Sequence, residues 1–284
     1  MTDDPRCSKD FQWLESRIVE HRSIAKDTWE LTLEAPNLAR WTLPGQFFMV
    51  RLAGLNDPLI GRALAMFDRG LDSQGNPQTV SVAYVVKGKY TQALSRFKAG
   101  QTVEIWGPLG NAFSNQPVDH LILVAGGVGI TPMLSLSSAA LGQGTYSQEG
   151  NFAKQVTLCY GARTQEYLVA LDVFEARGVR LAIATEDGSL GHRGRVTEVL
   201  KDLLSRSEGT SRIACCGPEP MMQAVSKIAH EHNVPCEVSL ETPMACGIGI
   251  CFTCVAKIDQ GDGTWDYRRT CVEGPIFESQ SIVW

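Results

Sequence analysis

The chain has 284 residues, 44% of them hydrophobic, so it can form two or three domains with a substantial core, and no apolar run reaches the roughly 18 residues of a membrane span. Its 26 basic and 31 acidic residues give a net charge of −5 without a lysine and arginine cluster, which argues against nucleic acid as a partner. Nine cysteines, an odd number, and an N-terminus unlike a signal peptide predict a cytoplasmic protein without membrane insertion.

Short strands separated by turn residues follow one another from residue 13 to about residue 113. Residues 28–34 alternate between polar and apolar, Pro44-Gly45 precedes a strand at 46–51, and a third strand at 80–86 ends near a glycine. Repeated strands with glycine and proline between them predict a small antiparallel β-barrel, interrupted by one helical piece at about 90–97.

Two places in this barrel are candidates for a phosphate-containing cofactor. Arg62 follows a glycine at a strand edge, where its guanidinium could make paired contacts with a phosphate. Gly88-Lys89-Tyr90-Thr91 is a glycine turn at a helix start, where N–H groups and a hydroxyl could receive a pyrophosphate. Neither is specific alone, because a surface arginine and a helix cap are the ordinary alternatives.

At Pro117 the pattern changes to alternating strands and helices. The apolar strand 121–125 leads into Gly126-Gly127-Val128-Gly129-Ile130-Thr131-Pro132-Met133 and a helix to about residue 141. We expect Thr131 at the N-cap and Pro132 at the first helical position. A dinucleotide pyrophosphate meets a helix N-terminus at such a turn, although the motif is not the strict G-x-G-x-x-G.

Further strands at 156–161, 179–185 and 212–218 predict a parallel sheet of the α/β class. In such sheets the ligand crevice lies at the carboxyl ends of the strands. Those ends carry Gly127, Gly161, Asp187 and Cys216.

Four cysteines near the C-terminus have the spacing of a plant-type [2Fe-2S] cluster. Cys246, Cys251 and Cys254 follow the C-x4-C-x2-C pattern, and Cys271 comes after sixteen more residues. The glycines between the first two cysteines would allow positive φ and let backbone N–H groups turn towards the sulfurs. A four-cysteine zinc site and a set of inert buried thiols remain the alternatives.

Together these motifs resemble the ferredoxin–NADP reductase superfamily and, within it, the electron transfer subunits of NAD-dependent (class 1B) dihydroorotate dehydrogenases. The motifs that carry the resemblance, besides those above, are Gly107-Pro108-Leu109-Gly110, Cys216-Gly217-Pro218 and Arg269-Thr270-Cys271-Val272-Glu273-Gly274-Pro275. The resemblance implies three domains: an FAD-binding antiparallel β-barrel at 1–116, an α/β NAD(P)-binding domain with a parallel sheet at 117–235, and a small [2Fe-2S] domain at 236–284.

The resemblance also implies which residues bind the cofactors. The cluster ligands are the four cysteines, and Cys216 orients the nicotinamide without bonding to it. The residues expected to bind FAD or the nicotinamide dinucleotide are Arg62, Ala63, Leu64, Ala65, Ala83, Tyr84, Val85, Tyr90, Thr91, Gly127, Gly129, Thr131 and Asp187.

The chain departs from the superfamily pattern at two flavin positions. Arg-Pro-x-Ser is replaced by Arg62-Ala63-Leu64-Ala65, which removes a hydroxyl, and Gly-Thr is replaced by Tyr90-Thr91. A backbone N–H at Ala65 could replace the lost hydrogen bond, so we expect FAD to be retained with altered affinity or potential.

By the same resemblance, hydride passes between the nicotinamide and FAD, and single electrons pass between FAD and the cluster. The partner would be an FMN-containing catalytic dehydrogenase subunit that oxidises dihydroorotate for pyrimidine biosynthesis, in a heterotetramer of two plus two. Arg163 could favour NADP, but NAD is the expected nucleotide. Two alternatives remain: an NAD(P)H-handling subunit of a ferredoxin reductase or hydrogenase, and a regulatory module that binds nucleotide without turnover.

Overall fold

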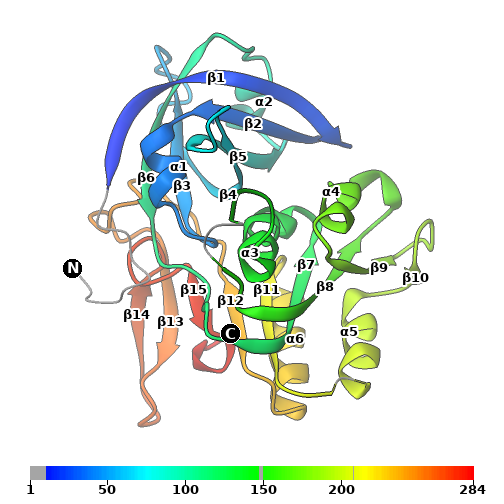
Figure 1. Cartoon of the computed structure of the whole chain (residues 1–284). Coiled ribbons are helices and arrows are strands. Elements are labelled where there is room, and N and C mark those ends of the chain that lie inside the picture. The colour runs from blue at the N-terminus through cyan, green and yellow to red at the C-terminus, as the bar shows by residue number, and fades with distance from the viewer. Residues whose placement is uncertain (1–10, 147–149, 207) are drawn as a thin grey trace.

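The computed structural model describes residues 11–146, 150–206 and 208–284 (Figure 1). Its first part is a closed six-stranded barrel with the strand order β1-β2-β5-β4-β3-β6. Every neighbouring pair is antiparallel, and β1 pairs with both β2 and β6, so no strand edge is left open. The strands are β1 (Gln12–Ala25), β2 (Thr28–Glu34), β3 (Phe47–Leu52), β4 (Arg62–Leu71), β5 (Pro77–Val85) and β6 (Thr102–Leu109). The predicted antiparallel barrel is confirmed.

Alternation along the strands builds the barrel core. Leu31 and Leu33 on β2 and Val80 and Val82 on β5 are fully buried, which is the period of two that directs every second side chain inwards. Two short helices lie against the barrel, α1 (Pro36–Trp41) and α2 (Lys89–Leu94). Gly88, just before α2, has φ of +115°, a conformation that side chains with a Cβ rarely adopt.

The second part is a seven-stranded sheet with the order β10-β9-β8-β7-β11-β12-β15. The first six strands in this order are parallel and β15 is antiparallel to β12. The strands are β7 (Val118–Gly126), β8 (Ala153–Ala162), β9 (Arg180–Thr185), β10 (His192–Arg193), β11 (Ser211–Cys216), β12 (Cys236–Ser239) and β15 (Ile276–Glu278). The predicted parallel α/β sheet is confirmed.

Helices cover both faces of this sheet. On β7, Leu121 and Leu123 pack in one core with α3 and α4, whereas Ile122 and Val124 pack in another with α5 and α6. Barrel residues, Ala83 among them, join the first core, so the barrel and the sheet share buried apolar contacts. The helices are α3 (Thr131–Leu141), α4 (Leu171–Ala176), α5 (Val196–Ser205) and α6 (Glu219–Glu231), with 3-10 turns η1 (Gly127–Ile130), η2 (Gly144–Tyr146), η3 (Gln165–Tyr167) and η4 (Ser279–Ser281).

The expected N-cap at Thr131 is wrong. The turn after β7 continues as the 3-10 helix η1, so Thr131 is already the first residue of α3 and Ile130 takes the cap position without a side-chain hydrogen bond. The local signal of threonine before proline was overridden because the 3-10 helix begins four residues earlier, at Gly127, whose φ is +52°.

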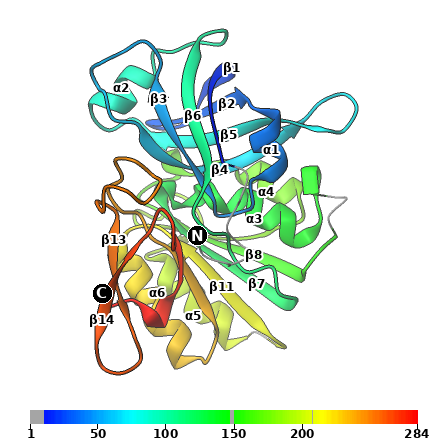
Figure 2. The same ribbon diagram turned by 90° about the vertical axis from the view of Figure 1, so that its left-hand side faces the viewer.

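The C-terminal part contributes a hairpin of β13 (Val255–Asp259) and β14 (Trp265–Arg269), which stands at one side of the sheet and below the barrel (Figure 2). Strands β12 and β15 come from the segment expected to form the cluster domain, yet they extend the nucleotide-domain sheet. The domain boundaries stay predictions. In the described ranges, no helix combines the length and the apolar character needed to cross a bilayer.

Candidate functional site

The cysteines of the C-terminal motif interact with one another. Cys251 interacts with Cys246 on the same loop, and Cys271, after β14, interacts with both Cys254 and Cys246. Hydrogen bonds from Thr253 lower the pKa of the Cys251 thiol to about 6, whereas burial raises the pKa of the Cys271 thiol to about 12. The loop also directs donors at sulfur, because the N–H of Ile248 lies 3.5 Å from the Sγ of Cys246.

The cysteine spacing fits a binuclear cluster. A zinc site would need all four thiolates around a single ion, whereas a [2Fe-2S] cluster is held by four cysteines across two irons. The C-x4-C-x2-C pattern followed by Cys271 is typical of the cluster and not of the C-x2-C pairs of a zinc site.

The two glycines of the loop adopt the conformation expected from the sequence. Gly247 has φ of +75° and Gly249 has φ of +83°. A Cβ on Gly247 would lie 2.5 Å from Cγ of Met49, and one on Gly249 would lie 2.6 Å from Cγ2 of Val272. Both positions thus need glycine for backbone conformation and for space.

The cluster loop packs directly on the part of the barrel that carries the expected flavin residues Ala63 and Ala65. Phe47, Met49, Trp106 and Leu109 form one buried group with the sulfur-bearing residues Cys254 and Cys271. Ala63 and Ala65 of the flavin motif pack against the same group. The Nε1–H of Trp106 donates to the carbonyl oxygen of Cys246 at 3.0 Å. The elements that carry the two expected cofactor sites are therefore in contact.

Two polar side chains fix the segment around Cys271. The Nδ2–H of Asn111 donates to the carbonyl oxygen of Ile276 at 2.9 Å, and its Oδ1 accepts from the N–H of Ile276 at 2.9 Å. Arg269 donates to the carbonyl oxygen of Gly249 at 3.1 Å and pairs with Glu273. These contacts tie the barrel, the cluster loop and the last cysteine to one another.

Arg62 and Tyr90, predicted from separate motifs, lie next to each other. The Arg62 guanidinium is 5.2 Å from the centroid of the Tyr90 ring, which favours a cation–π contact. The Tyr90 hydroxyl donates to the carbonyl oxygen of Val50 at 2.6 Å, and burial raises the pKa of that hydroxyl. Arg62 is exposed and its other contacts are the carbonyl oxygens of Ile60 and Gly61, so its guanidinium is accessible to an anion.

The other residues expected to bind FAD differ in the direction of their side chains. The Thr91 hydroxyl accepts from the N–H of Lys87 at 2.7 Å, which closes the turn before α2. Tyr84 points into the barrel, where its hydroxyl lies 2.8 Å from Nε2 of His21. Only the backbone of Tyr84 is therefore placed to contact a ligand, while Ala83 and Val85 face the opposite side of β5.

At the carboxyl edge of the parallel sheet, the glycine turn and the Cys-Gly-Pro motif touch. A Cβ on Gly129 would collide with the carbonyl oxygen of Cys216, so glycine is required for the two loops to meet. Cys216 is half-buried, and burial, followed by the nearby Glu241 carboxylate, raises the pKa of its thiol to about 12. Asp187, in the loop after β9, is exposed and lies two strands away from β7 in the sheet. Its carboxylate accepts from the hydroxyl of Ser189 at 2.6 Å.

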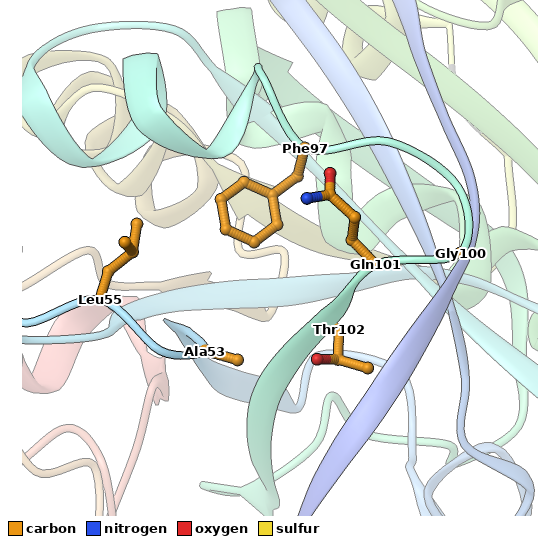
Figure 3. A pocket seen from close by; sticks show the side chains of 6 residues that line it. All are labelled: Ala53, Leu55, Phe97, Gly100, Gln101 and Thr102. Carbon is orange, nitrogen blue, oxygen red and sulfur yellow. The ribbon is translucent and has the colours of Figure 1, made fainter.

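A cavity of about 480 Å³ lies where β3 ends and β6 begins (Figure 3). Its lining has no ionisable side chain and includes none of the expected site residues, so we assign it no chemical role. The lining residues are Ala53, Leu55, Phe97, Gly100, Gln101 and Thr102.

Sequence reasoning missed Trp106 and Asn111 as parts of the site. Their partners, Cys246 and Ile276, are 140 and 165 residues away in the chain. No pattern within a short sequence segment indicates contacts over such separations. The only signal was that both residues flank the glycine and proline motif at 107–110.

Three family models cover most of the chain. The oxidoreductase FAD-binding domain matches residues 15–113, the oxidoreductase NAD-binding domain matches 123–227, and the iron–sulfur cluster binding domain of dihydroorotate dehydrogenase B matches 241–283. The electron transfer subunit of dihydroorotate dehydrogenase B (NAD(+)) from Desulforamulus reducens is 34% identical over 95% of this chain and 98% of its own. The chain belongs to this family of electron transfer subunits.

Other relatives agree with this family assignment. The subunit of the same name from Caldanaerobacter subterraneus subsp. tengcongensis is 31% identical over 96% of this chain and its whole length. A solved structure of the NADH-dependent reduced ferredoxin–NADP oxidoreductase superposes with a TM-score of 0.79, at 29% identity, over 95% of this chain and 90% of that one. The resemblance seen in the motifs is confirmed, and the family subunit is an oxidoreductase component with domains for FAD, NAD and an iron–sulfur cluster.

Proposed function

We propose that this chain carries electrons between NAD(H) and a separate catalytic subunit that oxidises dihydroorotate to orotate in pyrimidine biosynthesis. The names of the relatives at 31–34% identity support this substrate. The observation that carries the proposal is the seating of the cluster loop. Its inner face packs on the barrel, whereas Cys251 and its neighbours Ile250 and Phe252 are exposed, the last two at 73% and 62%. A carrier in this loop has one side towards the flavin strand and one towards a partner.

We assign the cofactor sites as follows. Bound FAD would supply the chemistry that links a two-electron nicotinamide to a one-electron cluster. Arg62 and the N–H groups of the turn before Thr91 would hold its diphosphate, and the backbone of Ala63 to Ala65 and of Ala83 to Val85 would contact the rest of the cofactor. The cluster ligands are Cys246, Cys251, Cys254 and Cys271.

The nicotinamide dinucleotide is placed in the crevice at the carboxyl ends of the parallel strands. Gly127 and Gly129 let its pyrophosphate approach the start of α3 near Thr131, and the neutral Cys216 thiol packs beside the nicotinamide. Arg163, directly after β8, could favour the 2′-phosphate of NADP, but the relatives at 31–34% identity are named for NAD(+). We therefore propose NAD, and a higher kcat/KM for NADH than for NADPH would test it.

The partner is proposed to be an FMN-containing subunit in a heterotetramer of two plus two. Eight cysteines lie in the described part of the chain and each is a free thiol, which fits a reducing compartment such as the cytoplasm. The domain limits at 116 and 235 are part of the same proposal.

The test is to isolate the native complex anaerobically and assay dihydroorotate-dependent reduction of NAD. We expect the co-purified complex to catalyse this reaction and the chain alone not to. The isolated chain should show flavin and cluster absorption bands that both bleach on adding NADH. Bleaching without any dihydroorotate activity in the complex would refute the substrate and leave electron transfer in place.

A second candidate is an NAD(P)H-handling subunit of a ferredoxin-linked complex. It is favoured by the superposition on a ferredoxin–NADP oxidoreductase with a TM-score of 0.79. Reduced ferredoxin in place of dihydroorotate as the electron donor distinguishes the two candidates. Bands that do not bleach with NADH would instead support the regulatory module.

A further inference from the structure

Trp106 occupies the junction between the flavin strand and the cluster loop. It lies on β6 (Figure 1) and is only 4% exposed. Its Nε1–H holds the carbonyl oxygen of Cys246 at 3.0 Å. At the other edge of the indole, Cη2 lies so near Gly61 that a Cβ there would be 3.0 Å away. One rigid ring therefore spans from the residue before Arg62 to the first cluster cysteine.

A second aromatic ring fixes the plane of this indole. Trp13 stacks on Trp106 with ring centroids 4.5 Å apart and an interplanar angle of 10°. Trp13 itself is 56% exposed, so it covers the buried indole from the solvent side. Stacked aromatic pairs of this kind stabilise a defined ring arrangement by more than their buried area alone. The direction of the Nε1–H is thereby set by β1 and β6 together.

The cluster loop depends on such external contacts. In the described chain, residues 240–254 contain neither helix nor strand, so neighbours outside the loop hold its backbone in place. The contact made by Arg269 reaches Gly249, within the loop, whereas that of Trp106 reaches the carbonyl of a cysteine itself. Trp106 therefore joins a cluster cysteine to the barrel by a hydrogen bond, in addition to the apolar packing of Cys254 and Cys271 on the barrel.

We propose that Trp106 is a positioning residue that fixes Cys246, and with it the cluster, relative to the flavin-binding strand. The proposal rests on the proposed electron-transfer function but makes a separate claim about one hydrogen bond. The Trp106→Phe change keeps an aromatic ring in the site but removes the N–H that holds Cys246, together with the outer part of the indole that reaches Gly61. A tryptophan that only fills space would lower the Tm on this change and leave the g-values of the cluster unchanged.

The experiment uses the full-length holoprotein and two measurements. Stopped-flow absorption after adding NADH follows flavin and cluster bands separately, and electron paramagnetic resonance of the dithionite-reduced protein records the cluster without NADH. For Trp106→Phe we expect unchanged flavin reduction, cluster bleaching slower by about tenfold, and altered g-values of the cluster. Trp41→Phe, which changes another tryptophan, 48% exposed on α1, is the control and should match the wild type in both measurements.

The two proposals fail separately. Wild-type g-values and wild-type cluster bleaching in Trp106→Phe would overturn the positioning role. A wild-type cluster that does not bleach with NADH would overturn the electron-transfer function, while the resonance spectrum still tests the positioning role.

If Trp106→Phe does not retain a cluster, the Trp13→Leu variant provides the test, because it removes the stacked ring and leaves the N–H of Trp106. For Trp13→Leu we then expect a small shift of the cluster g-values from those of the wild type, and an unchanged resonance spectrum would refute the positioning role of Trp106.

Discussion

Position 249 requires glycine for two reasons, a left-handed backbone conformation and a lack of space for a Cβ. Its φ is +83°, and a Cβ would lie 2.6 Å from the Val272 side chain. For Gly249→Ala we expect loss of most of the bound iron and a lower Tm, because about 1–2 kcal/mol of backbone strain adds to the collision. Iron analysis and thermal unfolding of the purified holoprotein measure both effects.

Gly261, in the hairpin between β13 and β14, is the matched control. Its φ of +80° is nearly that of Gly249, but no atom lies within 4 Å of an added Cβ. Gly261→Ala should therefore cost about 1–2 kcal/mol of strain and leave the iron content unchanged. Equal iron loss in both variants would mean that backbone strain alone, and not close approach, governs the cluster loop.

Cys216 tests the proposed role of a neutral thiol beside the nicotinamide. Burial raises its pKa to about 12, so the thiol stays protonated from pH 6 to pH 9. For Cys216→Ala we expect kcat/KM for NADH with an artificial acceptor to fall by about tenfold through poorer positioning. The pH profile should keep its shape over this range. A wild-type inflection between pH 8 and 9 that the variant abolishes would argue for a thiolate instead.

At the residue scale, the sequence revealed what is encoded within a short segment. The C-x4-C-x2-C spacing and the positive φ of Gly247 and Gly249 lie within one loop, so the glycine conformations could be predicted from the sequence. Trp106 and Asn111 were missed because their partners are brought near only by the packing of three domains. Arg62 and Tyr90 were each recognised, but their contact depends on how α2 returns to β4.

Among the elements, β1 is tied to β5 and to the segment after α2 by a half-buried histidine. His21 lies 2.8 Å from the Tyr84 hydroxyl through Nε2 and 2.8 Å from the carbonyl oxygen of Phe97 through Nδ1. Burial lowers the pKa of His21 below its ordinary value of 6.5. The unfolded chain therefore binds a proton before the folded one does, and the stability contributed by neutral His21 is lost as pH falls below about 6.5.

For His21→Gln we expect a lower Tm at pH 7.5 but a shallower decline of Tm between pH 7 and pH 5 than in the wild type. Thermal unfolding across this range measures it. His120 is also buried with a lowered pKa, so some acid sensitivity remains in the variant. Parallel curves for variant and wild type would show that His21 does not titrate on unfolding.

Most strands and helices could be predicted from the periodicity of apolar residues in the sequence, but the residues at which they begin and end could not. Strand β7 was recognised from an apolar run because a central parallel strand is buried on both faces. The start of α3 was misplaced because Gly127, at positive φ, and Gly129, closely packed against Cys216, extend the turn as a 3-10 helix. Such an end is decided by a neighbouring strand and has no signal in the helix sequence.

At the scale of the whole molecule, two ion pairs of different burial join the barrel and the nucleotide domain among the residues that the structure describes. Asp68 on β4 pairs with Arg177 after α4, with side chains 16% and 19% exposed. Arg177 also donates to the Ser138 hydroxyl at 2.7 Å. Lys26 pairs with Glu166 across the same two domains, but these side chains are 50% and 60% exposed. The two pairs therefore differ in solvent screening at a shared boundary.

We expect Arg177→Gln and Asp68→Asn each to lower the stability by about 1–2 kcal/mol, because each leaves a largely buried polar partner unmatched. The double variant should lose less than the sum, which is the mark of a direct interaction. Lys26→Gln and Glu166→Gln should each change the stability by less than about 1 kcal/mol, since water and salt screen that pair. Unfolding midpoints of all variants, at low and at 0.5 M salt, provide the comparison. Strict additivity at Asp68 and Arg177 would place the coupling of the two domains in their shared apolar core, where Ala83 already packs, and not in the ion pair.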